Sequence, residues 1–234
     1  MEQTVVLFDV DGTLVDTAGS GRYAFQAAFL QVFGVDAVMQ ADRRVRFAGM
    51  TDPLIIEALA DAGGIRPSDL TSKNGSLLAS FYHHLQVETD RLHESSRVLP
   101  GVQPLLERLA AMDHAYTGLI TGNLEKGARI KLEPFDLNRF FSTGGFGSDH
   151  PDRSRVARIA ADKMNRHHEI DVPADRVVVI GDTEHDITCA QANGFRSIAV
   201  QFDWVSKDRL MAANPDAYLP DLTDIPLVLE ALRL

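Results

Sequence analysis

Short runs of β-branched and apolar residues recur along the chain and predict buried strands. The first run covers residues 4–10, and similar runs cover residues 115–122, 140–147, 176–182 and 196–202. Between them, apolar residues with i, i+3, i+4 and i+7 spacing over residues 102–109 and 156–163 predict amphipathic helices. Strands that alternate with helices form βαβ units, so we expect an α/β fold: a Rossmann-like parallel sheet with helices on both faces.

The interval between residues 19 and 97 breaks this alternation, because it contains three helical patterns and no convincing strand. One pattern covers residues 25–33, one begins at a Thr51 N-cap and stops at Gly63, and one covers residues 77–85. The sequence therefore predicts an inserted α-helical subdomain, residues 19–97. The Rossmann-like core is then formed by residues 1–18 and 98–234.

Polar side chains follow three of the predicted strands at the point where each strand ends. Asp9 and Asp11 follow the first strand, residues 121–123 (Thr-Gly-Asn) the second, and Asp182 and Asp186 the fourth. Ligands bind at the carboxyl ends of the strands in open parallel sheets, so we expect these groups to meet in one crevice. Four carboxylates in one crevice repel one another unless a cation joins them, and Mg²⁺ prefers oxygen ligands. These residues therefore predict a magnesium site.

Composition narrows the class of protein further. The chain of 234 residues carries 23 basic and 33 acidic side chains, a formal net charge of −10, which argues against a nucleic-acid partner. The single cysteine, Cys189, excludes an intrachain disulfide. The sequence has no apolar run near the roughly 20 residues of a spanning helix and no signal-peptide pattern, so we expect a cytoplasmic protein that does not bind membranes. A monomer and a homodimer both remain open.

The strand-end motifs resemble those of the haloacid dehalogenase-like (HAD) hydrolase superfamily, in its phosphatase branch with a helical cap. Residues 9–16 (DVDGTLVD) match the first motif of that family, Thr121 the second, and residues 181–186 (GDTEHD) the fourth. The resemblance extends over essentially the whole chain. It implies a phosphoric monoester hydrolase whose inserted helices close over the active site as a cap.

The resemblance also implies catalytic roles for individual residues. Asp9 is expected to attack phosphorus and form an aspartyl-phosphate, and Asp11 to protonate the leaving alkoxide and then deprotonate water. Thr121 is expected to donate a hydrogen bond to the phosphoryl group, together with Asn123 and backbone amides near Gly12.

The same resemblance assigns ligands to the expected Mg²⁺ ion. These are the Asp9 carboxylate, the Asp11 backbone carbonyl and the Asp182 carboxylate, with Asp186 acting directly or through water.

The third motif of the family departs from its usual form, because the lysine expected after the third strand is absent. That lysine offsets the negative charge of the nucleophile and the phosphate. Arg153, in the first turn of the following helix, is our predicted substitute, and it is preferred to Lys126 and Lys163. The alternative for Arg153 is a surface ion pair with Asp149 or Asp152.

The segment over residues 47–55 resembles the cap loop of phosphoglycolate phosphatase-like members. In those proteins a glycine and its neighbours face the active site, so Gly49 and Thr51 are predicted to contact substrate, as is Gly122 in the core. Three nearby arginines are further candidates, with a solvated surface as the alternative: Arg43, Arg44 and Arg46.

The leading function is thus a Mg²⁺-dependent phosphatase acting on a small phosphorylated metabolite, with phosphoglycolate the first substrate to test. A β-phosphoglucomutase-like sugar-phosphate mutase is the enzymatic alternative, because it uses the same motifs and a helical cap. A phosphoacceptor signalling module also places an aspartate beside Mg²⁺ on a parallel sheet. Asp11 and the cap argue against that module, since both serve rapid turnover.

Overall fold

The structure, a computed structural model, describes residues 2–42 and 44–234. Arg43, a predicted substrate contact, lies outside the described residues. Six parallel strands form the central sheet, in the order β5-β4-β1-β6-β7-β8. Two very short strands, β2 and β3, pair antiparallel beside it.

The elements have the following bounds. The strands are β1 (Thr4–Phe8), β2 (Val15–Asp16), β3 (Arg97–Val98), β4 (Ala115–Ile120), β5 (Gly144–Gly145), β6 (Val177–Gly181), β7 (Arg196–Val200) and β8 (Ala217–Leu219). The α-helices are α1 (Ser20–Phe33), α2 (Ala37–Ala41), α3 (Asp52–Ala62), α4 (Pro67–Arg91), α5 (Val102–Ala110), α6 (Glu125–Leu132), α7 (Arg153–His168), α8 (Glu184–Ala192), α9 (Lys207–Ala212) and α10 (Ile225–Leu232). Short 3₁₀ turns cover His93–Ser95, Glu133–Phe135, Leu137–Phe140 and Ala174–Arg176.

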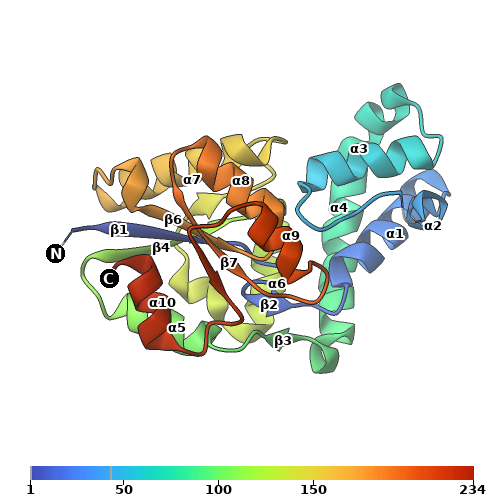
Figure 1. Cartoon of the computed structure of the whole chain (residues 1–234). Coiled ribbons are helices and arrows are strands. Elements are labelled where there is room, and N and C mark those ends of the chain that lie inside the picture. The colour runs from blue at the N-terminus through green and yellow to red at the C-terminus, as the bar shows by residue number, and fades with distance from the viewer. Residues whose placement is uncertain (1, 43) are drawn as a thin grey trace.

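Both faces of the sheet are covered, because successive residues of a strand point to opposite sides. In β1, Val5 and Leu7 join the apolar cluster beneath α7 and α8, whereas Val6 and Phe8 join the cluster that includes α5, α6 and α10. Figure 1 shows α7 and α8 above the sheet and α5 and α10 below it. The predicted α/β fold with a parallel sheet is confirmed.

Four helices, α1 to α4, lie between β2 and β3 and form what we call the helical segment. The segment has its own apolar core, in which the rings of Phe25 and Phe81 stack with centroids 4.2 Å apart. Leu124, which precedes α6 in the sheet-bearing part, packs into the same core and joins the two parts. In Figure 1 the segment stands at one end of the sheet, on the side where β1 ends. The division at residues 19 and 97 stays a prediction.

Two expected elements differ from those observed. The strand predicted over residues 140–147 is reduced to Gly144 and Gly145, and a 3₁₀ turn precedes it. A Cβ at Gly144 would lie 2.5 Å from the carbonyl oxygen of Leu119, so this position needs a glycine where the strand pairs with β4. The helical segment also contains a fourth, short helix, α2, whose first turn is capped by the Asp36 side chain.

None of the helices in the described part of the chain is both long enough and apolar enough to cross a membrane.

Candidate active site

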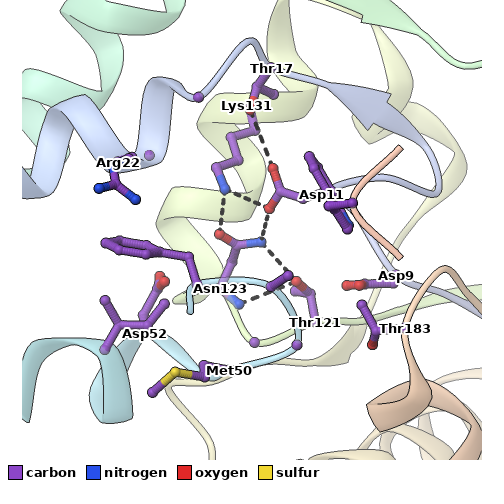
Figure 2. A pocket seen from close by; sticks show the side chains of 18 of the residues that line it. Asp9, Asp11, Thr17, Arg22, Met50, Asp52, Thr121, Asn123, Lys131 and Thr183 are labelled. Atoms are coloured by element: carbon purple, nitrogen blue, oxygen red, sulfur yellow. Dashed lines mark hydrogen bonds and ion pairs between the residues drawn. The ribbon is translucent and has the colours of Figure 1, made fainter. Parts of the chain in front are cut away.

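Strands β1, β4 and β6 are neighbours in the sheet and end at the same edge, where the polar motif residues follow them. A cavity of about 240 Å³ lies between these strand ends and the helical segment. Its polar lining comes chiefly from the loops after β1 and β4, as Figure 2 shows. Its apolar lining comes from the helical segment: Phe25, Phe47, Met50, Ile55 and Phe81.

Three buried carboxylates, those of Asp9, Asp182 and Asp186, form a cluster in which one oxygen atom of each lies within 4.8 Å of the others. Arg153 enters this cluster from the first turn of α7. Its Nη2 atom lies 2.5 Å from Asp186 Oδ1 and 3.0 Å from Asp9 Oδ2, and its side chain is 8% exposed. Neither Asp149 nor Asp152 forms the surface ion pair with Arg153 that was the alternative, because Asp149 binds Lys163 and Asp152 caps α7.

Burial disfavours the ionised forms of two carboxylates in this cluster, those of Asp9 and Asp182, and so raises the pKa of each. Burial, partly offset by Arg153, raises the pKa of Asp9 to about 7. Burial, together with the charges of Asp186 and Asp9, also raises the pKa of Asp182 well above its usual range. Asp186 and Asp9 raise the pKa of Arg153 against the opposing effect of burial, so this guanidinium stays charged.

The donor set fits a divalent cation that prefers oxygen ligands. Three carboxylates and one guanidinium leave a formal excess of two negative charges in a buried space, which Mg²⁺ would neutralise. Within the cluster, Asp186 is the least available ligand. Its Oδ1 accepts from Arg153, and its Oδ2 accepts from the Thr183 amide (3.0 Å) and hydroxyl (2.7 Å) in a capping box at the start of α8. Asp186 is therefore placed to orient Arg153 and α8.

Trp204, on the loop after β7, makes an unanticipated contact with this cluster. Its indole Nε1 donates to Asp182 Oδ2 over 2.5 Å, although its side chain is half exposed. The ring also lies against Gly12, where an added Cβ would be 2.6 Å from Trp204 Cζ2 and 2.4 Å from Asp182 Oδ2. Gly12, with φ +78°, thus allows Asp182 and the indole to approach the first motif. One oxygen of a predicted metal ligand is occupied by the chain's only tryptophan.

Asp11 points away from the carboxylate cluster and towards a buried lysine, Lys131 of α6. Lys131 Nζ lies 2.6 Å from Asp11 Oδ2 and 2.7 Å from Asn123 Oδ1. Asn123 Nδ2 also donates to Asp11 Oδ2 (2.8 Å), and the Thr17 hydroxyl reaches Asp11 Oδ1 over 3.3 Å. Burial alone would raise the pKa of Asp11, but Lys131 and these hydrogen bonds outweigh burial and lower it.

Thr121 has its hydroxyl oriented by Asn123. Its Oγ1 accepts from Asn123 Nδ2 (2.8 Å) and from the Asn123 backbone amide (3.2 Å). Both acceptor positions of the hydroxyl are then used, so its hydrogen is left to donate into the cavity that Thr121 lines.

The loop before α3 lies directly on the core. Asp52 N donates to Gly122 O (2.7 Å), and the buried Asp52 carboxylate accepts from Leu124 N (2.8 Å) at the start of α6. A Cβ at Gly122 would lie 2.1 Å from Met50 O, so only a glycine admits the loop at this distance. Burial, partly offset by Lys131, raises the pKa of Asp52 to about 6.

The structure brings together most, but not all, of the predicted site residues. The cavity is lined by eight of them: Asp9, Asp11, Asp182, Arg153, Thr121, Gly122, Asn123 and Gly49. Asp186 does not line the cavity itself, but it binds Arg153, which does. Gly12 and Thr51 do not line the cavity. Thr51 turns its hydroxyl to Pro151 O (2.8 Å), because residues on either side of it, Met50 and Asp52, face the cavity.

Sequence reasoning missed Lys131, Asp52 and Trp204. A signal for Lys131 was available, since it follows Leu124 and Ala128 at i+7 and i+3 on an apolar stripe, where an unpaired lysine is costly. Asp52 and Trp204 lie on loops or at a helix start, where no periodic pattern marks them.

A parallel α/β enzyme with a buried carboxylate cluster at its strand ends is the class that this fold and site define. More specifically, the chain belongs to the haloacid dehalogenase-like hydrolase family, whose pattern matches residues 6–200. As an enzyme of this family it is a phosphatase, as the motifs predicted.

Relatives and solved structures agree with that family over nearly the whole chain. A phosphoglycolate phosphatase of Vibrio parahaemolyticus is 25% identical over 94% of this chain and 93% of its own length. A 5'-nucleotidase of Pseudomonas aeruginosa is 28% identical over 97% of this chain and 95% of its own length. The crystal structure of a β-phosphoglucomutase from Clostridium difficile superposes with a TM-score of 0.74 at 15% identity, covering 100% of this chain and 98% of that one, which shows a shared fold.

Proposed function

We propose that this phosphatase is Mg²⁺-dependent and hydrolyses a small organic phosphate monoester through an aspartyl-phosphate on Asp9. The observation that carries the proposal is the buried cluster of Asp9, Asp182 and Asp186 with the Arg153 guanidinium 3.0 Å from Asp9. A bound Mg²⁺ ion, held by Asp9, Asp182 and the Asp11 carbonyl, would supply charge neutralisation for the phosphate oxygens.

The proposed reaction has two steps. An Asp9 oxygen attacks phosphorus, and the bond from phosphorus to the ester oxygen breaks while Asp11 gives its proton to that oxygen. Water then attacks the aspartyl-phosphate, transfers a proton to Asp11 and breaks the bond between phosphorus and Asp9. Thr121 donates its free hydroxyl hydrogen to the phosphoryl group, and Arg153 stabilises the charge that develops there.

The cavity supports a small substrate with an anionic group beyond the phosphate. Arg22 of α1 lines it, with its guanidinium 5.2 Å above the Phe47 ring and no acidic partner among the described residues. By contrast, Arg44 donates to the carbonyl oxygens of Gln40 and Ala41 at the end of α2 and does not line this cavity. Because Arg22 could receive a carboxylate, phosphoglycolate is the first substrate to test. The names of the relatives support the same choice.

A panel of phosphate esters tests the proposal. Phosphate release from phosphoglycolate, a nucleoside 5'-monophosphate, β-glucose 1-phosphate and pyrophosphate is measured with Mg²⁺ and with EDTA. Asp9→Asn should abolish release, whereas Asp162→Asn, an exposed position on α7, should leave it unchanged. Activity that survives in Asp9→Asn or in EDTA would contradict the proposal, and conversion of β-glucose 1-phosphate to its isomer without phosphate release would favour the mutase.

A further inference from the structure

Lys131 is a buried cation that the reaction as proposed does not use. It lies on α6, with its side chain 7% exposed and its ammonium group aimed at the cavity. A Cβ at Gly21, in the first turn of α1, would lie 3.4 Å from its Nζ, so the ammonium is enclosed by the helical segment as well as by the core. A buried ammonium persists only where acceptors surround it, and here the acceptors are Asp11 and Asn123.

The hydrogen bonds around Lys131 have only one consistent set of directions. An ammonium group donates and never accepts, so the Asn123 side chain must turn its oxygen towards Lys131 (2.7 Å). The amide nitrogen of Asn123 is then fixed on the opposite side, where it donates to Asp11 Oδ2 and to Thr121 Oγ1, both at 2.8 Å. Figure 2 shows this chain of contacts from Lys131 through Asn123 to Thr121.

The same contacts distinguish the two oxygens of Asp11. Oδ2 receives two short hydrogen bonds from buried groups, Lys131 at 2.6 Å and Asn123 at 2.8 Å. From the described residues, Oδ1 receives only the long 3.3 Å contact from Thr17, on the connection between β2 and α1. Oδ1 is therefore the oxygen that can be released to exchange a proton with the leaving group.

We propose that Lys131 is a positioning residue: it anchors Asp11 through Oδ2, so that Oδ1 performs the acid–base step, and it fixes Asn123 so that Thr121 donates to the phosphoryl group. This inference rests on the proposed function, since it requires Asp11 to protonate the ester oxygen. The orientation of Asp11 and Asn123 is thus assigned to a residue of α6, which lies outside the sequence motifs.

The leaving group provides a test that a purely structural role would not satisfy. An alkoxide needs a proton from Asp11 to depart, whereas p-nitrophenolate departs without one. The experiment compares kcat/KM for p-nitrophenyl phosphate with kcat/KM for the best alkyl ester of the panel, because this constant reports the step in which the ester bond breaks. The ratio of the two constants does not depend on how much of a variant is folded.

Lys131→Met should lower kcat/KM for the alkyl ester by about 10²-fold or more, the usual range for general acid catalysis, and lower it much less for p-nitrophenyl phosphate. Lys131→Arg, which keeps a charged donor, should hold the ratio near that of the wild type even if both constants fall. Lys163→Met is the matched control, since Lys163 also pairs with a carboxylate, that of Asp149, but away from the cavity. It should change neither constant.

Equal losses of kcat/KM on both esters in Lys131→Met, or no loss on either, would overturn the positioning role. So would a fall in Lys131→Arg of the ratio of kcat/KM for the alkyl ester to that for p-nitrophenyl phosphate as large as the fall in Lys131→Met. Failure of the proposed function looks different, because the wild-type protein would then release phosphate from neither ester.

Discussion

Arg153 is the cation on which the buried carboxylate cluster depends, and its removal should be costly. The guanidinium bridges Asp186 (2.5 Å) and Asp9 (3.0 Å), and all three side chains are at most 8% exposed. Arg153→Met leaves these carboxylates close together and without a counter-charge. Removing one partner of a buried ion pair costs about 3–5 kcal/mol of folding free energy.

The same helix offers a matched control. Arg158 of α7 pairs with Asp162 over 3.4 Å, but both side chains are more than half exposed. Such surface pairs contribute about 0–1 kcal/mol, so Arg158→Met should change the free energy of unfolding little.

Urea unfolding of the wild type and both variants at pH 8, with EDTA present to exclude divalent ions, measures the difference. We expect Arg153→Met to lose about 3–5 kcal/mol and, in separate assays with Mg²⁺, to lose about 10²–10³-fold in kcat/KM, the usual effect of removing a preorganised donor. An Arg153→Met protein whose unfolding free energy lies within about 0.5 kcal/mol of Arg158→Met would refute the reasoning.

Three further predictions concern the groups around the cavity. The raised pKa of Asp52, about 6, means that the unfolded chain loses this proton first as pH rises, so Asp52 should contribute a loss of stability between about pH 4 and 6. Asp52→Asn should remove this contribution and so gain up to about 3 kcal/mol relative to the wild type across this window in urea unfolding, and a pH-independent difference would contradict the assignment. Because Trp204 donates to Asp182, Mg²⁺ titration should change the fluorescence of this single tryptophan. Asp182→Asn should abolish the change. An unchanged wild-type spectrum at saturating Mg²⁺ would count against the metal site. Gly49→Ala places a Cβ 2.2 Å from His185 at a residue with φ +77°, so it should destabilise the protein by more than about 1 kcal/mol in thermal unfolding. The loss should be smaller in a His185→Ala background, because the contact is then removed. Equal losses in both backgrounds would exclude this contact as the cause.

The parts of the site at strand ends were predictable because they follow from local patterns and a general property of sheets. Asp9, Thr121 and Asp182 each directly follow an apolar run, and parallel strands bring their carboxyl ends to one edge whatever the details of packing. Arg153 could be proposed only from the charge that the site needs, and its contact with Asp9 depends on how α7 docks on the sheet.

The remaining site residues depend on contacts between distant parts of the chain. Lys131 lies 120 positions from Asp11, and nothing in the spacing of α6 specifies which carboxylate its ammonium meets. Thr51 was expected to face substrate, but a turn of the backbone points its hydroxyl to Pro151, 100 positions away. Trp204 is on a loop whose course is set by packing against Phe202 and Gly12, with no periodic pattern in the sequence.

The central claim is that Asp9 carries the phosphoryl group during turnover. Its most direct test is to quench the enzyme in acid within milliseconds of adding labelled substrate and Mg²⁺, reduce the acyl phosphate with borohydride, and locate the modified residue by mass spectrometry. The account predicts modification at Asp9 alone. Modification at any other residue, or turnover with no modified Asp9 at any quench time, would contradict it.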